Sequence, residues 1–106
     1  MAIQRVGLAG LIPVAFQTMS LSNSTAVALN STIQAGASVL HISVETNAAR
    51  MRADGTDPTL TTGVVFIEDA APVEMGYDGG SALKFQRTTG TSVVSVNAWK
   101  YAGGDR

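Results

Sequence analysis

Residues 38–46 read SVLHISVET and alternate for most of their length between apolar and polar side chains. Leu40, Ile42 and Val44 fall on one face of an extended strand, because successive side chains of a strand point to opposite faces. The other face receives Val39, His41, Ser43 and Glu45. An apolar face opposite a mostly polar one predicts a half-buried β-strand.

The same period recurs after this segment. Residues 48–52 alternate Ala49 and Met51 with Arg50 and Arg52, and an Asp-Gly turn and an Asp-Pro break follow at 53–58. Further strands are predicted at residues 14–21, 25–29, 63–68, 73–77, 82–87 and 91–101, with a short linking strand at 31–34. Only residues 47–52 compete as a helix, and that stretch is too short for a stable isolated helix.

About seven to nine short strands, spaced by about 8–12 residues, are typical of an antiparallel sandwich or barrel. We therefore predict an all-β protein built as an antiparallel β-sandwich. Jelly-roll and immunoglobulin-like topologies both remain open, because periodicity does not determine strand order. We expect an extended N-terminal arm at residues 1–13, one sandwich domain at 14–102 and a flexible tail at 103–106.

Charged side chains are scarce in this chain. They make up 14% of the 106 residues, against roughly 25% in typical soluble domains, and hydrophobic residues make up 45%. Seven basic and eight acidic residues give a net charge of −1, without any block of like charge. Because nucleic-acid binding depends on a basic face that neutralises phosphates, we expect no nucleic-acid partner.

A membrane span and cysteine chemistry are not expected either. The apolar run from Val6 to Phe16 is broken by Pro13 and is much shorter than the roughly 20 residues that cross a bilayer. The chain has no cysteine, which excludes disulfides, thiolate metal sites and cysteine nucleophiles.

The residues that carry chemistry in other proteins form no recognisable constellation. His41 is the single histidine, and no Gly-x-Ser-x-Gly element accompanies it. Asp54, Asp57 and Asp78 fall in turns but lack the ligand spacing of a calcium loop, and the glycines at 79–80 lack the spacing of a phosphate loop. We therefore expect a non-enzymatic protein without cofactor, metal or small-molecule substrate.

Surface recognition is the remaining kind of function, and it has nine candidate interface residues. Trp99 and Tyr101 share one face of the last strand and suit anchors for a partner, although the same pair would also cap the edge of the core. Arg50 and Arg52 project from one face and suit bidentate ion pairs across an interface, with an ordinary solvated edge as the alternative. Apolar residues along the N-terminal segment suit strand addition to a neighbour, or draping over one. These are Ile3, Val6, Leu8, Leu11 and Ile12.

The stretches ISVETNAARMRADGTDPTLTTGVVF (42–66) and MGYDGGSALKFQRTTGTSVVSVNAWKY (75–101) carry a resemblance to a known group. They resemble small virion structural proteins of tailed bacteriophages, in which a strand ending in Val-Glu precedes an Arg-x-Arg strand and an Asp-Gly-Thr-x-Pro-Thr turn. The matching elements are residues 44–45, 50–52, 54–59, 83–85 and 95–101, and the resemblance covers Ser24 to Tyr101. Met51 departs from it, since an aromatic or β-branched residue is expected between the two arginines.

The resemblance implies a β-sandwich that decorates or cements an assembled capsid. Its partners would be the major capsid protein and further copies of this chain, as a dimer or trimer. Its location would be the capsid surface of the virion, after synthesis in the cytoplasm of a bacterial host. Two other roles remain open, namely a tail, collar or fibre-adaptor protein and a carbohydrate-binding module on the virion surface.

Overall fold

The computed structural model describes residues 10–102 and places eight strands and one short helix in that range. Ile3, Val6, Leu8 and the expected tail at 103–106 lie outside the described residues. The elements in chain order are β1 (Leu11–Leu21), β2 (Val27–Ala28), α1 (Ser31–Gly36), β3 (Val39–Thr46), β4 (Ala49–Arg52), β5 (Val64–Phe66), β6 (Val73–Gly76), β7 (Lys84–Arg87) and β8 (Ser92–Tyr101).

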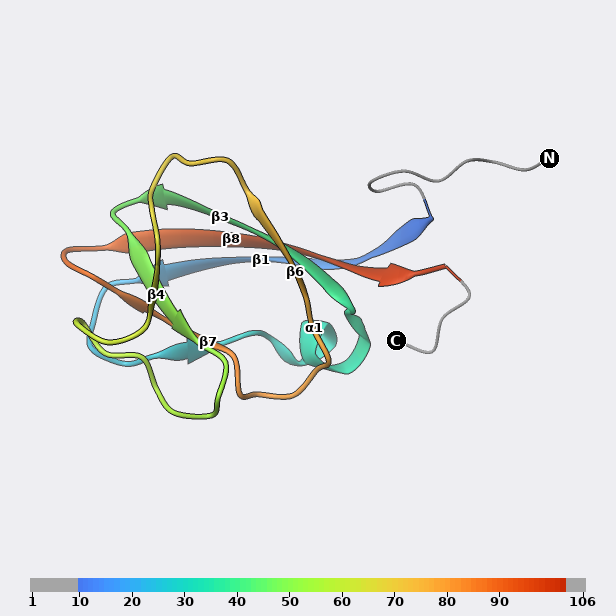
Figure 1. The fold of residues 1–106 in the computed structure, drawn as a ribbon, viewed down its shortest axis with the longest axis horizontal. Coiled ribbons are helices and arrows are strands. Elements are labelled where there is room, and N and C mark those ends of the chain that lie inside the picture. The colour runs from blue at the N-terminus through green and yellow to red at the C-terminus, as the bar shows by residue number, and fades with distance from the viewer. Residues whose placement is uncertain (1–9, 103–106) are drawn as a thin grey trace.

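The strands form two four-stranded sheets, which confirms the predicted all-β sandwich (Figure 1). Sheet A has the order β1-β8-β3-β6 and sheet B the order β2-β7-β4-β5, with every neighbouring pair antiparallel. In both sheets most neighbouring strands are far apart along the chain. Eight antiparallel strands in this order, divided between two sheets, form a jelly roll. The strand order thus decides between the two topologies that the sequence leaves open.

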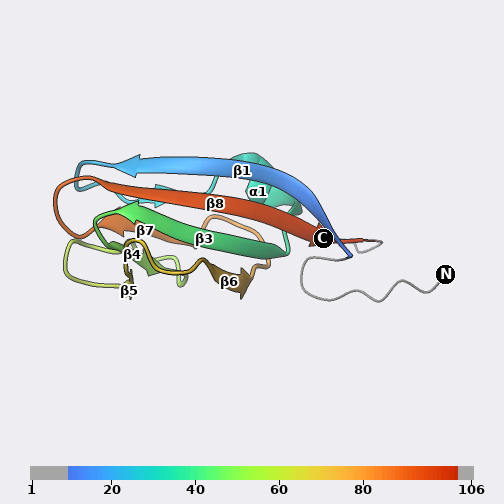
Figure 2. The ribbon, with the colours of Figure 1, turned by 90° about the horizontal axis from the view of Figure 1, so that it is seen from above.

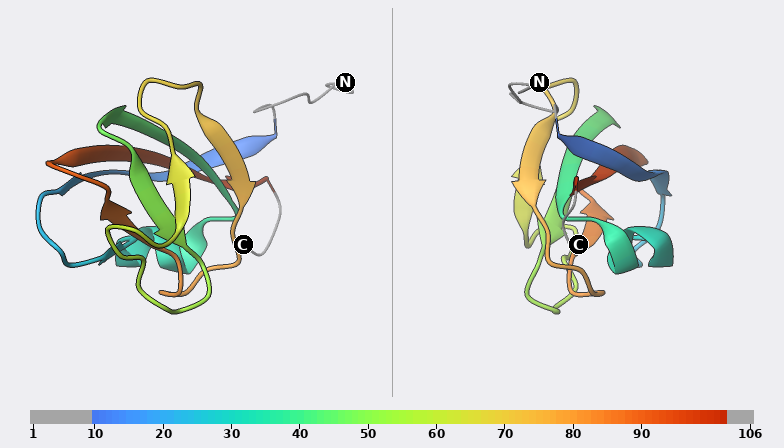
Figure 3. Two further views of the ribbon diagram at one scale, coloured as in Figure 1. Left: turned by 60° about the vertical axis from the view of Figure 1, so that its left-hand side comes forward. Right: turned by 90° about the vertical axis from the view of Figure 1, so that its right-hand side faces the viewer.

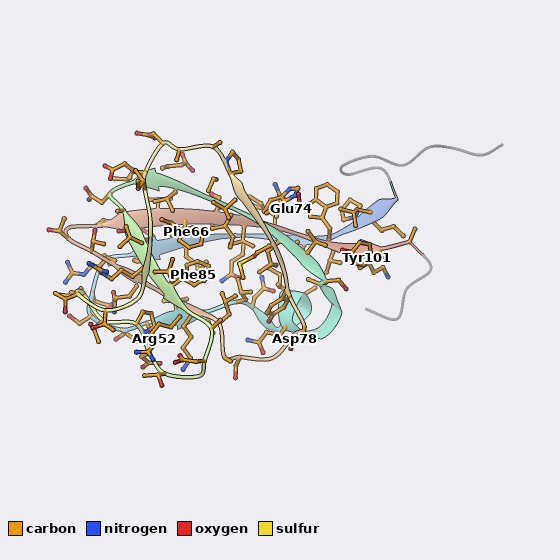
Figure 4. All side chains as sticks on the ribbon, viewed as in Figure 1. Arg52, Phe66, Glu74, Asp78, Phe85 and Tyr101 are labelled. Carbon is orange, nitrogen blue, oxygen red and sulfur yellow. The ribbon has the colours of Figure 1, made fainter. Side chains whose placement is uncertain are left out.

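The core lies between the sheets and follows the predicted alternation. Leu40, Ile42 and Val44 of β3 are buried against the partner sheet. Phe85 of β7 is fully buried, and its ring meets that of Phe66 edge-on, with centroids 6.4 Å apart and planes at 82°. In Figure 4 these two rings lie inside the sandwich. Such edge-to-face pairs add about 0.5–1.5 kcal/mol to the burial of their area.

Residues 31–36 form helix α1, so the prediction of a linking strand at 31–34 is wrong. Asn30 caps the helix, because its side-chain oxygen accepts a hydrogen bond from the backbone N–H of Ile33 at 2.9 Å. Ile33 is fully buried, and the helix packs against β1 and β8 (Figure 3). Sheet A is longer than sheet B, so the helix supplies the second layer where sheet B ends. A single turn of this kind is held by its packing and is too short to be stable by itself.

Strand β1 begins at Leu11, three residues before the predicted start. Leu11 pairs with Tyr101 and Ile12 with Lys100, so residues 11–13 belong to the sandwich and the expected arm at 1–13 is too long there. The register shifts between Pro13 and Ala15, where the strand contains a bulge. The start of β1 and the end of β8 therefore lie side by side at one end of sheet A (Figure 2).

Candidate functional site: the terminal face of sheet A

An apolar surface lies on the outer face of sheet A, at the end where β1 starts and β8 finishes. The ladder places Leu11 beside Tyr101, then Pro13 beside Trp99, and Phe16 beside Asn97. Directly opposed residues of an antiparallel pair point to the same face, so these side chains share one surface. We call Leu11, Pro13, Phe16, Trp99 and Tyr101 the terminal face.

Two of its aromatic side chains are open to solvent. Phe16 is 57% exposed and Tyr101 is 56% exposed. In Figure 4, Tyr101 lies at the far end of β8, away from the two core phenylalanines. Single exposed apolar residues are common on protein surfaces, but two exposed aromatic side chains on the same face of one strand pair mark a surface suited to a partner.

Trp99 is held in place from its own sheet. Its ring centroid lies 5.8 Å from that of His41 on the adjacent β3, and the planes are tilted by 56°. The Nε2 atom of His41 lies 3.7 Å from a carboxylate oxygen of Glu74 on β6. The indole N–H of Trp99 is buried and has no hydrogen-bond partner among the described residues. A buried donor without an acceptor costs about 1–3 kcal/mol.

Ile12 lies beside this surface but faces the other way. It pairs with Lys100, between the Leu11–Tyr101 and Pro13–Trp99 pairs, so its side chain points to the opposite face of the sheet. That side chain is 41% exposed. The structure thus brings together three predicted candidates, Leu11, Trp99 and Tyr101, with Ile12 on the opposite side of the same ribbon.

Arg50 and Arg52 lie on the other sheet and are engaged by their own chain. Arg50 donates from Nε to the carbonyl of Leu60 at 3.0 Å and from a terminal nitrogen to the carbonyl of Gly63 at 3.1 Å. Arg52 forms a two-bonded pair with Asp54, at 3.1 and 2.5 Å. These bonds hold the loop at 53–63 against sheet B. Arg52 forms its bidentate pair with a carboxylate of its own chain, whereas the sequence predicted such pairs across an interface.

The same loop closes over the outer face of sheet B. Pro58 is buried, and Lys84 bonds Asp57 at 2.8 Å. Gln86 lies on this face beside Arg50 and is only 1% exposed. Around Gln86 the outer face of sheet B is therefore covered by its own chain, whereas the terminal face of sheet A keeps exposed aromatic side chains.

The pair on sheet B also changes the titration of its members. The hydrogen bonds from Arg52 are the main cause that lowers the pKa of Asp54, and the backbone N–H of Thr56 adds to it. The bond to Asp54 raises the pKa of Arg52 in turn. Both groups are solvent-exposed, so this pair shapes the loop more than it stabilises the fold.

Two hollows in the described part of the chain are large enough to consider as sites, and neither carries a set of reactive groups. One of about 340 Å³ is lined by Met75, Tyr77, Asp78 and Leu83 together with small neighbours. The other, of about 380 Å³, lies beside the Arg52–Asp54 pair. Residues 10–102 contain no group of three side chains able to hold a metal ion, and no helix there has the length and apolarity to cross a membrane.

Pro13 and Phe16 belong to this surface but were not among the residues predicted from the sequence. The position of Phe16 carries a readable signal, because it shares a face with Thr18 and Ser20 and lies opposite Met19 and Leu21. A phenylalanine on the polar side of a strand is a candidate contact residue.

Comparisons with protein-family models, curated proteins and solved structures found no match for this chain.

Proposed function

We propose that this chain is a virion structural protein of the capsid decoration or cement kind. In this role it binds the major capsid protein and further copies of itself, and it catalyses no reaction. The observation that carries the proposal is the terminal face, an exposed aromatic surface on one sheet of a jelly roll whose other sheet is covered in part by its own loop. The resemblance of residues 24–101 to virion structural proteins of tailed bacteriophages supports the same role.

The energetics fit repeated docking on a shell. Burying one phenylalanine side chain contributes about 1.5–3 kcal/mol, so one terminal face gives a modest affinity. Many copies on a symmetric shell, or several copies joined in an oligomer, convert modest contacts into stable attachment. The site of action in this proposal is the capsid surface, after synthesis in the cytoplasm of the bacterial host.

The experiment is cryo-electron microscopy of particles that contain the chain, combined with a substitution in the terminal face. Density repeated over the icosahedral shell supports the proposal, and Phe16→Asp should weaken binding to particles by at least about tenfold, which corresponds to about 1.4 kcal/mol. Ser20→Asp is the matched control, since Ser20 is exposed on the same face of the same strand. Equal binding by both variants would remove the terminal face from the proposal.

The same images test the role as a tail, collar or fibre adaptor, because density confined to the portal vertex or tail would replace the decoration role. The carbohydrate-binding role has one observation in its favour, the exposed rings of Phe16 and Tyr101 on a single face. Binding of a glycan that Trp99→Ala abolishes would establish it.

A further inference from the structure

A second exposed apolar surface lies on the edge of sheet B. Val64 and Val65 of β5 are 60% and 45% exposed, and Ile67, just after the strand, is 68% exposed. Strand β5 pairs with β4 on one side only, because it is the last strand of its sheet (the yellow strand in the left panel of Figure 3). Its other side presents backbone N–H and C=O groups without a strand partner among the described residues.

The other sheet edges carry features that discourage pairing with a further strand. Strand β1 contains Pro13 and a bulge, β6 contains Glu74, and β2 has only two residues. Charges, prolines, bulges and shortness are the usual means by which proteins protect sheet edges. Strand β5 is short, but it has no charge, proline or bulge, and its residues are β-branched or aromatic.

We propose that β5 pairs with β5 of a second copy of this chain, antiparallel and around a two-fold axis at Val65. The pairing joins two copies of sheet B into one sheet of eight strands. A two-fold contact uses the same surface on both partners, so every contact is made twice. Val65 then faces its own symmetry mate, and Ile67 faces Gly63 of the other copy.

The charges at the two ends of β5 favour this direction. Arg50 lies on β4 opposite Val65, and its guanidinium extends to the start of β5, where it donates to the carbonyl of Gly63. Glu68 and Asp69 follow the end of the strand, and neither forms an ion pair within residues 10–102. Antiparallel pairing brings the acidic end of one copy to the basic end of the other, whereas parallel pairing would place like charges together.

This inference rests on the self-association included in the proposed function and names its surface. The terminal face is on sheet A, so pairing through β5 leaves it open. The purified chain alone tests the pairing. A dimer that fails to bind particles would overturn the proposed function only, and a monomer that binds them would overturn the pairing only.

Single cysteines test the register, because the natural chain has none. Val65→Cys should form a disulfide-linked dimer under mild oxidation, since the two Cβ atoms would lie about 4.5–5.5 Å apart before small adjustment. Ile67→Cys should not, although Ile67 is more exposed, because its two copies would be separated by roughly 14 Å along the strands. Thr89→Cys, in an exposed turn, measures random collision. Linking at Val65 no faster than at Thr89, or equal linking at Ile67, would overturn the proposal.

Light scattering coupled to size exclusion gives the second readout. The unmodified chain should have twice the 10.9 kDa mass of one copy at high micromolar concentration. Val65→Lys should return it to one copy, because two lysines would meet on the axis, while Thr89→Lys should leave the dimer unchanged. A monomeric unmodified chain, or a Val65→Lys variant that stays dimeric, would refute the pairing.

Discussion

The two isoleucines at positions 33 and 67 provide a sharp test of the fold, because they differ completely in burial. Ile33 in α1 is fully buried, and Ile67 is 68% exposed. Ile33→Ala should lower the free energy of unfolding by about 2–5 kcal/mol, the range for deleting a buried isoleucine side chain. Ile67→Ala should change it by no more than about 0.5 kcal/mol, as expected for a surface site. Alanine favours a helix more than isoleucine does, so a loss at position 33 comes from the core and not from helix propensity.

Urea denaturation, followed by circular dichroism and by the fluorescence of the single tryptophan, measures both values. Dilute samples keep self-association out of the comparison. For a chain of this size the loss at Ile33 corresponds to a melting temperature lower by at least about 8 °C. Ile33→Val is the graded control and should cost about 0.5–1.5 kcal/mol. Equal, small effects at positions 33 and 67 would refute the conclusion that α1 completes the core beside sheet B.

Three further outcomes follow from the loops and the cap. Gly63 has φ +135°, and an added Cβ would lie 3.1–3.3 Å from three neighbouring atoms, so Gly63→Ala should lower the free energy of unfolding by about 1–3 kcal/mol in denaturation. Gly55→Ala should lower it clearly less, because Gly55 has φ +86° but open space around the added Cβ. Asn30→Ala removes the cap of α1 and should cost about 1 kcal/mol by the same assay. Because the folded-state pKa of Asp54 is lowered by Arg52, the stabilisation by this pair is complete above the ordinary aspartate pKa and is lost as pH falls through the lowered value. The melting temperatures of the natural chain and of Asp54→Asn should therefore converge in acid, and a constant difference down to the lowest pH would contradict the role of this pair.

Much of the fold was readable from local alternation. The face of β3 formed by Leu40, Ile42 and Val44 is buried as predicted. The inward direction of Phe85 also agrees with the period of its segment. These predictions hold because the side-chain period of a strand is a property of the backbone and needs no knowledge of partners.

The candidate site was readable only in part. Trp99 and Tyr101 do share a face, as their spacing required. Phe16 joins them from a strand more than eighty positions away in the sequence, and no pattern within either segment gives the register that brings them together. The hydrogen-bond partners of Arg50 could not be predicted from the sequence either. A guanidinium that can bind a carboxylate of a partner protein can equally bind the carbonyls of its own loop.

The sequence by itself determined the all-β class, the approximate strands and the inward faces, because each depends on neighbours along the chain. Only the tertiary structure decided the jelly-roll order, the helical state of residues 31–36 and which apolar residues stay exposed. Val64 and Val65 are as apolar as any core residue, yet they are exposed because β5 is the last strand of its sheet. Gln86 is as polar as any surface residue, yet it is buried where a loop fixed by Arg50 and Lys84 covers its sheet. Burial is a property of what packs above a residue, and that is set by contacts between segments far apart in the chain.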